Sequence, residues 1–523
     1  GAGPELLGLF ELPYALGLRW ADLKAVAGGP MASISLPVSG HDVGTVVVID
    51  VTGRAPAVPL RSAAERAKQA GAAVRDVLMA GEKVTVWNLP DGARRRPIGV
   101  FTKDDLLLIA DPPDVLGPVL AAWGDPKQSL AETAAYRAIR GRTAMKPAET
   151  ADLMWFFDPF GWDTATRTPP TGKKKRVKDT MEVMKQEGFD GVRAIGGSAA
   201  FASGECDALV RVAVYAPPPH RGALNMLSFR PATDLKPAAG LPGDLAACLV
   251  GRIDLMTAFE SFGGIFDEIA ADGEKGTYKE LIDDLRDNPK GPRVDLRKEI
   301  VAQVGDVVTV LTDCQQPLTP TSDRAVAVFT VKDEAVVAAA VRRAVEDDPK
   351  VRRTTVAGRT VWEIVPDPPV AKPGEPPPAP LPNAALCVAD GKFYVATQAA
   401  LVEKLFRAGG PRLDDQPDYQ RVCRQFDRLG GGSACARLFA RPAEDFRLTY
   451  DQWRNGKLDE ATSIYGIGLA ALVPKNPAAN TVWTLDGRKL PAYDRVSRLV
   501  GPAGVLLFVR DDGWDGVGFV LPR

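Results

Sequence analysis

The chain has 523 residues, of which 45% are hydrophobic and 25% are charged, as in ordinary globular proteins. This length is enough for roughly two to four ordinary domains. The 65 basic and 66 acidic side chains nearly cancel, so no global field attracts nucleic acid, and no apolar run is long enough to span a bilayer. We therefore expect neither a nucleic-acid partner nor a transmembrane segment.

The first part of the chain, residues 22–159, predicts strands and helices in a definite order. β-Branched and apolar runs predict the strands, and apolar residues at helical spacing predict the helices. The expected strands are 32–36, 45–51, 83–89, 98–102, 106–110 and 153–157, and the expected helices are 60–73, a helix capped by Asp111, and 130–140. Asp104 and Asp105 separate two of these strands, where Asp favours the tight turn of a hairpin.

Residues 295–442 repeat this order. The expected strands there are 307–311, 325–331, 360–365, 385–388, 393–396 and 434–439, and the expected helices are 334–345, 399–407 and 417–426. Residues 97–124 align without a gap on 383–410, and residues 130–159 align on 413–442. We therefore expect an internal duplication whose two copies place their strands in the same order.

Each copy continues into a C-terminal part with further strands. These are expected at 192–202, 207–215, 224–229, 464–473, 481–485, 505–509 and 517–521, and a helix is expected at 255–270. A Pro- and Gly-rich segment separates the halves, which we place at 1–238 and 239–523, and a Pro-rich insertion at 366–382 occurs only in the second half. The predicted fold class is α+β, with two related halves, each a mostly antiparallel β-sheet with helices packed on it.

Residues suited to catalysis or metal binding are scarce. The chain contains two histidines, His41 and His220, and no CxxC motif among six cysteines. Histidine is the commonest metal ligand and the usual general base near neutral pH. The GxGxxA sequence at 466–471 runs into prolines instead of a helix, and we interpret the basic run at 173–178 as a solvated loop. The sequence therefore predicts no catalytic, cofactor-binding or metal-binding residue, and no cofactor.

The cysteines give one sharper expectation. Cys387 aligns with Phe101 of the first copy, so we expect Cys387 to be buried in a sheet and unpaired, as a small apolar residue would be. From the sequence, a disulfide between Cys423 and Cys435 stays an open alternative in an oxidising compartment.

Several short motifs together resemble a family of exported planctomycete-type bacterial proteins of unknown function. The motifs are Asp22-Leu23-Lys24 with Gly28-Gly29, residues 101–111, Ser129-Leu130 with Tyr136-Arg137, Asp158-Pro159, residues 193–197 and Asp512-Gly513-Trp514. The resemblance implies a duplicated α+β protein outside the cytoplasm, periplasmic or secreted. The chain begins with Gly1 instead of Met, which fits a mature exported protein whose signal peptide is removed, or an artificial start. The family supplies no catalytic residues.

We expect a non-enzymatic exported protein that binds a ligand or associates with the cell envelope. One alternative is a hydrolase whose carboxylates lie between the two halves, which paired carboxylates with raised pKa values in a shared pocket would favour. Another is a structural subunit of a larger assembly, which an exposed apolar patch would favour. The sequence does not identify a partner, and another envelope protein and a second copy of the chain are the two candidates.

Overall fold

The computed structural model of the chain describes residues 18, 20–38, 42–69, 71–88, 97–146, 149–166, 180–233, 235–271, 273–315, 318–319, 321–367, 382–407, 409–458 and 487–523. These residues form two compact units. Unit 1 contains the described residues up to Thr133 with short pieces from 160–166, 452–458 and 487–490, and unit 2 contains the others. The units divide the chain differently from the predicted halves, because residues 134–159 belong to unit 2; the halves, as sequence repeats, stay a prediction.

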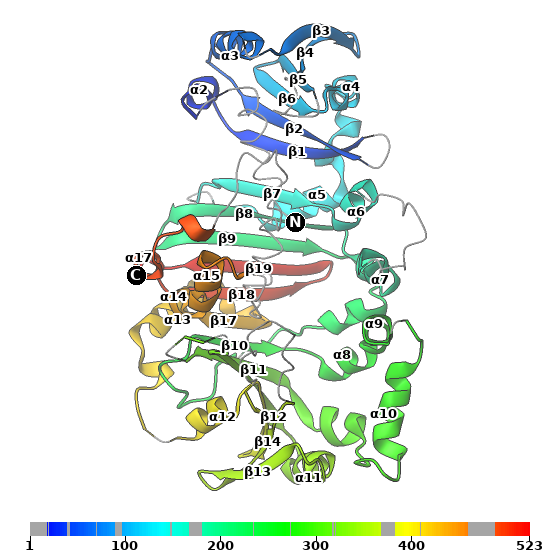
Figure 1. Ribbon diagram of the computed structural model, residues 1–523, viewed down its shortest axis with the longest axis vertical. Helices are drawn as coiled ribbons and strands as arrows, with labels where there is room; N and C mark the ends of the chain where they lie inside the picture. Colours follow the sequence, from blue (N-terminus) through cyan, green and yellow to red (C-terminus); the bar gives the residue numbers. More distant parts are fainter. Residues whose placement is uncertain are drawn as a thin grey trace, which may run out of the picture. The chain divides into compact units, whose positions relative to one another are not determined.

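Unit 1 is built on a six-stranded antiparallel sheet with the strand order β1-β2-β6-β5-β4-β3 (Figure 1). Its strands are β1 (Met31–Val38), β2 (Asp42–Asp50), β3 (Ala73–Met79), β4 (Glu82–Asn88), β5 (Ile98–Lys103) and β6 (Leu106–Asp111). Its helical segments include α2 (Trp20–Val26), α3 (Ala57–Gln69), η1 (Pro113–Val115), α4 (Leu116–Ala121), η2 (Pro126–Gln128), η3 (Leu130–Glu132) and α6 (Pro159–Thr166).

Both faces of this sheet are covered by helices. In β6, Leu107 and Ile109 join one apolar cluster with residues of α2 and α3. Leu108 and Ala110 point the other way and join a second cluster with residues of α4. A strand that is buried on both faces needs a continuous apolar run, which explains why β6 shows no apolar–polar alternation.

Unit 2 is built on a thirteen-stranded sheet with the order β13-β14-β15-β16-β12-β11-β10-β17-β18-β19-β9-β8-β7. Its strands are β7 (Leu153–Phe157), β8 (Ala194–Ser203), β9 (Cys206–Tyr215), β10 (Ala247–Arg252), β11 (Val304–Cys314), β12 (Asp323–Val331), β13 (Val351–Val356), β14 (Arg359–Ile364), β15 (Ala384–Ala389), β16 (Lys392–Ala396), β17 (Ala436–Ala440), β18 (Ala503–Arg510) and β19 (Gly513–Val520).

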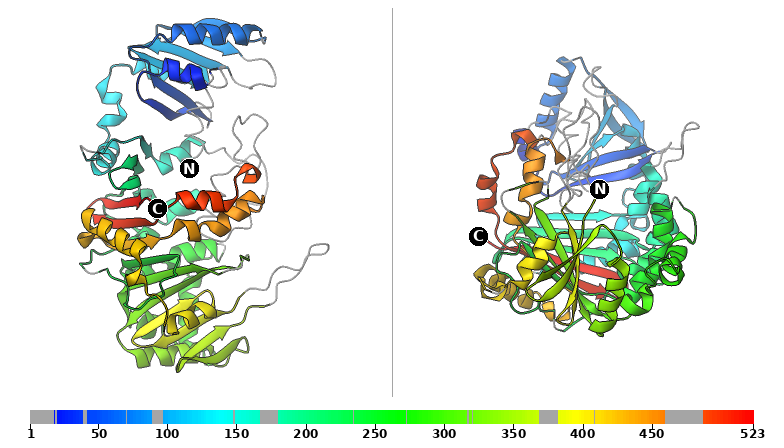
Figure 2. Two further views of the ribbon diagram at one scale, coloured as in Figure 1. Left: turned by 90° about the vertical axis from the view of Figure 1, so that its left-hand side faces the viewer. Right: turned by 60° about the horizontal axis from the view of Figure 1, so that its bottom comes forward.

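The helical segments of unit 2 precede and follow these strands. They include α5 (Ala134–Arg142), α7 (Thr180–Gln186), η5 (Gly222–Leu227), α8 (Leu255–Ser261), α9 (Gly263–Ile269), α10 (Thr277–Asp287), η6 (Leu296–Val301), α11 (Glu334–Val345), α12 (Ala399–Phe406), η7 (Leu413–Asp415), α13 (Pro417–Arg428), α14 (Pro442–Asp445) and α17 (Tyr493–Val496). Helix α15 (Arg447–Arg454) begins in unit 2, and its last three residues are assigned to unit 1. The green helices α8, α9 and α10 gather at one side of the sheet (Figure 1; right-hand view of Figure 2).

Part of the large sheet has the same topology as the sheet of unit 1. The order β11-β12-β16-β15-β14-β13 matches β1-β2-β6-β5-β4-β3 strand for strand. In both cases a helix, α3 or α11, follows the second strand. The predicted duplication requires the same strand order in both copies, and the two sheets have it. Common descent of the two copies stays a prediction.

Six further strands correspond in pairs, β7, β8 and β9 with β17, β18 and β19, whereas β10 has no counterpart. Leu153 of β7 lies opposite Ala199 of β8, and Ala436 of β17, which aligns with Leu153, lies opposite Leu507 of β18. The hairpins β8–β9 and β18–β19 both close over a two-residue turn, 204–205 and 511–512. The two three-stranded groups join edge to edge, β9 against β19, so they form one continuous sheet.

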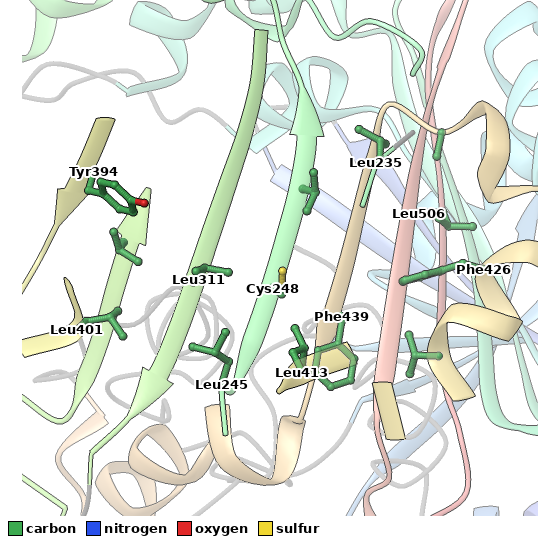
Figure 3. Packing of buried hydrophobic residues seen from close by; sticks show 14 of the residues in the cluster. Leu235, Leu245, Cys248, Leu311, Tyr394, Leu401, Leu413, Phe426, Phe439 and Leu506 are labelled. Atoms are coloured by element: carbon green, nitrogen blue, oxygen red, sulfur yellow. The ribbon is translucent and has the colours of Figure 1, made fainter. Parts of the chain in front are cut away.

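The main core of unit 2 lies between this sheet and the helices α12 and α13. Figure 3 shows Leu401 of α12 and Phe426 of α13 beside Leu311, Cys248 and Phe439 of the strands. Phe439 is only 1% exposed. Packing of this kind fixes α13 on the sheet through its apolar face and leaves its opposite face available.

Several expectations are confirmed. The fold is α+β with antiparallel sheets and packed helices, and none of the described helices is long and apolar enough to cross a membrane. The predicted hairpin turn has its residues, Asp104 and Asp105, at positive φ values of 49° and 59°. Cys387 is 0% exposed in β15 and free, and Cys423 and Cys435 are also free.

Other expectations are wrong. Residues 224–229 do not form a strand, because most of them belong to the helical segment η5, which begins at Gly222 with φ 54°. Leu224 is buried within this segment. The helix expected at 255–270 is two helices, α8 and α9, which join at Phe262-Gly263. The sequence patterns also missed β3 and β13. The strands expected at 464–473 and 481–485, His41, the GxGxxA sequence and the whole basic run at 173–178 lie outside the described residues, as does most of the Pro-rich insertion.

Candidate anion-binding site

The hydrolase alternative depends on carboxylates with raised pKa values, and unit 2 contains such groups. Burial raises the pKa of Asp323, and the nearby Asp445 carboxylate raises it further. Burial also raises the pKa of Glu444, which lies near Asp418. These side chains do not line the cavity described below, so their perturbation does not identify a catalytic pair.

Arginine and lysine side chains form ion pairs with other carboxylates in unit 2. Arg324 donates to Asp313 at 2.6 Å, and Lys404 contacts the same carboxylate at 2.8 Å. Arg441 donates to Asp418 at 2.6 Å. We interpret the cluster as a buried ion-pair network that joins strands to helices. Within the described parts of the chain, no group of three or more His, Cys, Asp or Glu side chains could hold a metal ion.

A more distinctive site is built on α13. Pro417 occupies the first turn, where its missing N–H costs nothing, and Asp418 lies at the positive end of the helix dipole. Val422 and Phe426 are buried, and the Phe426 ring packs edge-on against Phe519 at 5.6 Å. The opposite face of the helix is strongly basic, which makes α13 a clearly amphipathic helix.

This basic face lines a cavity of about 320 Å³. The lining residues are Glu205, Arg421, Arg424, Gln425, Arg428, Leu521 and Pro522. Glu205 belongs to the β8–β9 turn, where Gly204 adopts φ 59°, and Leu521 and Pro522 follow β19. The cavity therefore combines three segments that are far apart in the sequence.

The three guanidinium groups differ in how their hydrogen bonds are used. Arg421 donates to the carbonyl oxygen of Pro522 at 2.7 Å, and Arg428 forms an ion pair with Glu205. Arg424 forms neither an ion pair nor a hydrogen bond with any residue that the structure describes. Three positive charges thus face one negative charge, so the cavity carries an excess of positive charge and an unused planar donor group.

The cavity lacks an activated nucleophile. Gln425 points its amide nitrogen at the Cys206 sulfur, 3.5 Å away. Burial raises the pKa of the Cys206 thiol, with a further contribution from the neighbouring Glu205 carboxylate. A thiol held protonated at neutral pH is a poor nucleophile. The arrangement can hold an anion but shows no group prepared to attack one.

The sequence predicted no site residues, so Arg421, Arg424 and Arg428 were missed. Their spacing along one helix face was a readable signal, because the aligned positions in the first copy are Ala138, Gly141 and Met145. The walls supplied by distant segments were not readable. Of the two histidines, His220 is described: its ring stacks on Trp514 at 5.4 Å and contacts the carbonyl oxygen of Ala216, outside the cavity.

No protein-family model matches the chain, no curated protein is detectably similar to it, and no solved structure matches its fold.

Proposed function

We propose that the chain is a non-enzymatic, exported binding protein whose ligand carries a phosphate, sulfate or carboxylate group, bound in the cavity on α13. Arg424, which has no hydrogen-bond or ion-pair partner among the described residues, carries this proposal together with Arg421 and Arg428 beside it. Arginine forks bind planar and tetrahedral oxyanions through paired N–H groups, and such charge-assisted bonds are stronger than neutral ones.

The cavity suits a small anionic group or the charged end of a larger ligand. Its volume of about 320 Å³ is at the small end of the range for ligand sites. Leu521 and Pro522 supply an apolar wall, which lowers the local dielectric and strengthens the attraction between guanidinium and anion. Arg424 and Arg428 are exposed, so we expect binding to weaken as the salt concentration rises.

Titration calorimetry of the full chain tests the proposal. Phosphate, sulfate and acetate are titrated separately at constant ionic strength, so that the anion's charge and geometry are the variables. Replacing Arg424 by Gln removes charged donors, and we expect Kd to rise roughly 5- to 30-fold. Arg495→Gln is the matched control, because Arg495 is exposed on α17, outside the cavity. Equal anion affinity in the two variants would contradict the proposal.

We also propose that unit 2 contains one complete repeat and the C-terminal part of the other, products of an internal duplication. The shared strand order and hairpin register support this origin. Helix α5 contacts the β18–β19 hairpin through Arg142 and Asp512, and helix α13 contacts the β8–β9 hairpin through Arg428 and Glu205. An experimental structure in which β1–β6 and β11–β16 superpose poorly would oppose it.

Export is supported by the resemblance described above. Fractionation of cells that express the full-length protein tests it. Recovery of the chain in the cytoplasmic fraction would oppose export without affecting the proposed anion site.

A further inference from the structure

Helices α8, α9 and α10 form a small helical layer at one side of the large sheet (Figure 1). Their aromatic residues meet at Tyr278, whose ring lies 5.4 Å from Phe266, 5.6 Å from Phe262 and 5.9 Å from Phe259. This contact joins α10 to the α8–α9 pair.

Asp267 holds the connection between α9 and α10 in place. Its carboxylate accepts the backbone N–H groups of Gly276 at 2.6 Å and Tyr278 at 2.7 Å. The side chain is itself 8% exposed. A buried carboxylate that satisfies two backbone donors at a helix start fixes the hairpin, so the surface of this layer is preorganised.

The apolar surface of the layer is incompletely covered. No residue of α8 or α10 is buried, and Asp267 is the buried residue of α9. Ile269 is 70% exposed, Leu281 is 43% exposed and Phe262 is 37% exposed. Phe262, Phe266 and Ile269 follow the i, i+4, i+7 spacing of one helical stripe, and Tyr278 and Leu281 belong to a second stripe that meets it. We call the exposed set, Phe262, Ile269 and Leu281, the α9–α10 surface.

The segment around this surface is strongly acidic. Residues 254–288 contain ten Asp and Glu residues against three Lys and Arg residues, although the whole chain has a net charge of only −1. The negative charge also affects Glu187, the residue after α7: burial raises the pKa of Glu187, and the Glu268 and Asp267 carboxylates raise it further. Asp254, Glu260 and Asp283 of this segment already pair with Arg230, Arg297 and Arg286. Glu274 and Glu280 are exposed and can pair with the cations of a partner. An exposed apolar surface on an acidic segment is complementary to an apolar stripe flanked by Lys and Arg.

We propose that the α9–α10 surface is the docking site for a basic amphipathic helix of a partner protein. Two neighbouring helices present stripes whose exposed residues can contact the apolar face of a third helix, and the surrounding carboxylates would pair with its basic flanks. This docking site is separate from the anion cavity, which has the opposite charge, so either proposal can fail without the other.

The test is fluorescence anisotropy with a labelled Leu/Lys peptide of about 18 residues, long enough for five helical turns. A peptide of the same composition in scrambled order keeps the charge but loses the amphipathic face. The full chain is compared with an Ile269→Ser/Leu281→Ser variant and with Leu499→Ser, a control at a site that is 77% exposed outside this surface. Circular dichroism confirms that each variant is folded.

We expect the amphipathic peptide to bind the parent chain and the control alike, and the double variant at least tenfold more weakly. Equal binding of the scrambled peptide would reduce the effect to charge alone and overturn the proposal. Unchanged affinity of the double variant would also overturn it. Neutral phosphatidylcholine vesicles form a further arm: if the parent chain binds them and the double variant does not, the surface belongs to a membrane instead of a helix.

Discussion

Arg142 offers the most exacting test of how α5 is attached to the large sheet. Its side chain is 15% exposed and donates to Asp515 at 2.7 Å, to Asp512 at 3.0 Å, and to the carbonyl oxygens of Trp514 at 2.7 Å and Val214 at 3.1 Å. Arg142→Met keeps much of the apolar stem but removes all these donors. The helix then loses its polar link to β9 and β19.

The expected cost follows from what remains unpaired. Removing one partner of a buried ion pair costs about 3–5 kcal/mol, because a charge stays buried without compensation. Here Asp515 keeps a hydrogen bond from Arg510, and Asp512 is 39% exposed, so we expect a value at the lower end, about 3 kcal/mol. The carbonyl oxygens of Trp514 and Val214 also lose a donor, which adds to the loss of unfolding free energy.

Guanidinium chloride unfolding of the full chain, followed by tryptophan fluorescence, measures this change. Since the chain has two units, the loss belongs to the transition in which unit 2 unfolds, and each transition is fitted separately. Arg140→Met is the control, because Arg140 is an exposed residue of the same helix. A loss below about 1 kcal/mol for Arg142→Met, or an equal loss for the control, would refute the reasoning.

Two further predictions concern buried carboxylates of unit 2, Asp313 and Asp323. Asp313→Ala leaves Arg324 and Lys404 without the carboxylate between them, and we expect a loss of about 3–5 kcal/mol in chemical unfolding; a loss below about 1 kcal/mol would contradict the burial argument. Asp323 has a raised pKa through burial, so its contribution to stability is complete below its unfolded pKa and is lost as the pH rises through its folded pKa. Asp323→Asn cannot ionise, so the variant should gain stability relative to the parent as the pH rises above about 4, the ordinary pKa of an Asp side chain in the unfolded chain. A stability difference that does not change with pH would show that Asp323 has an ordinary pKa in the folded protein.

The parts of the fold that local chemistry determines were predictable. The β5–β6 turn needs residues that tolerate positive φ, and Asp104 and Asp105 are such residues. Asp390 and Gly391 predict the β15–β16 turn for the same reason. The strand β3, at one edge of its sheet, was missed because Arg75 and Asp76 interrupt its apolar alternation.

Edge strands carry charges for a reason that the sequence pattern does not express. An unpaired edge is protected from further pairing by charged side chains, and these obscure the period that identifies a strand. β13, the last strand of the large sheet, shows the same effect with Arg352 and Arg353. The anion cavity was hidden for another reason: Glu205, Arg424 and Pro522 meet only after β9 has paired with β19.

The central claim is that an anion binds between the guanidinium groups of α13. Crystals of the full chain soaked in sodium selenate, with diffraction recorded at the selenium edge, locate the anion directly. The account predicts an anomalous peak in the cavity lined by Arg421, Arg424 and Arg428. Selenate peaks at other surface arginines, with none in this cavity, would contradict it.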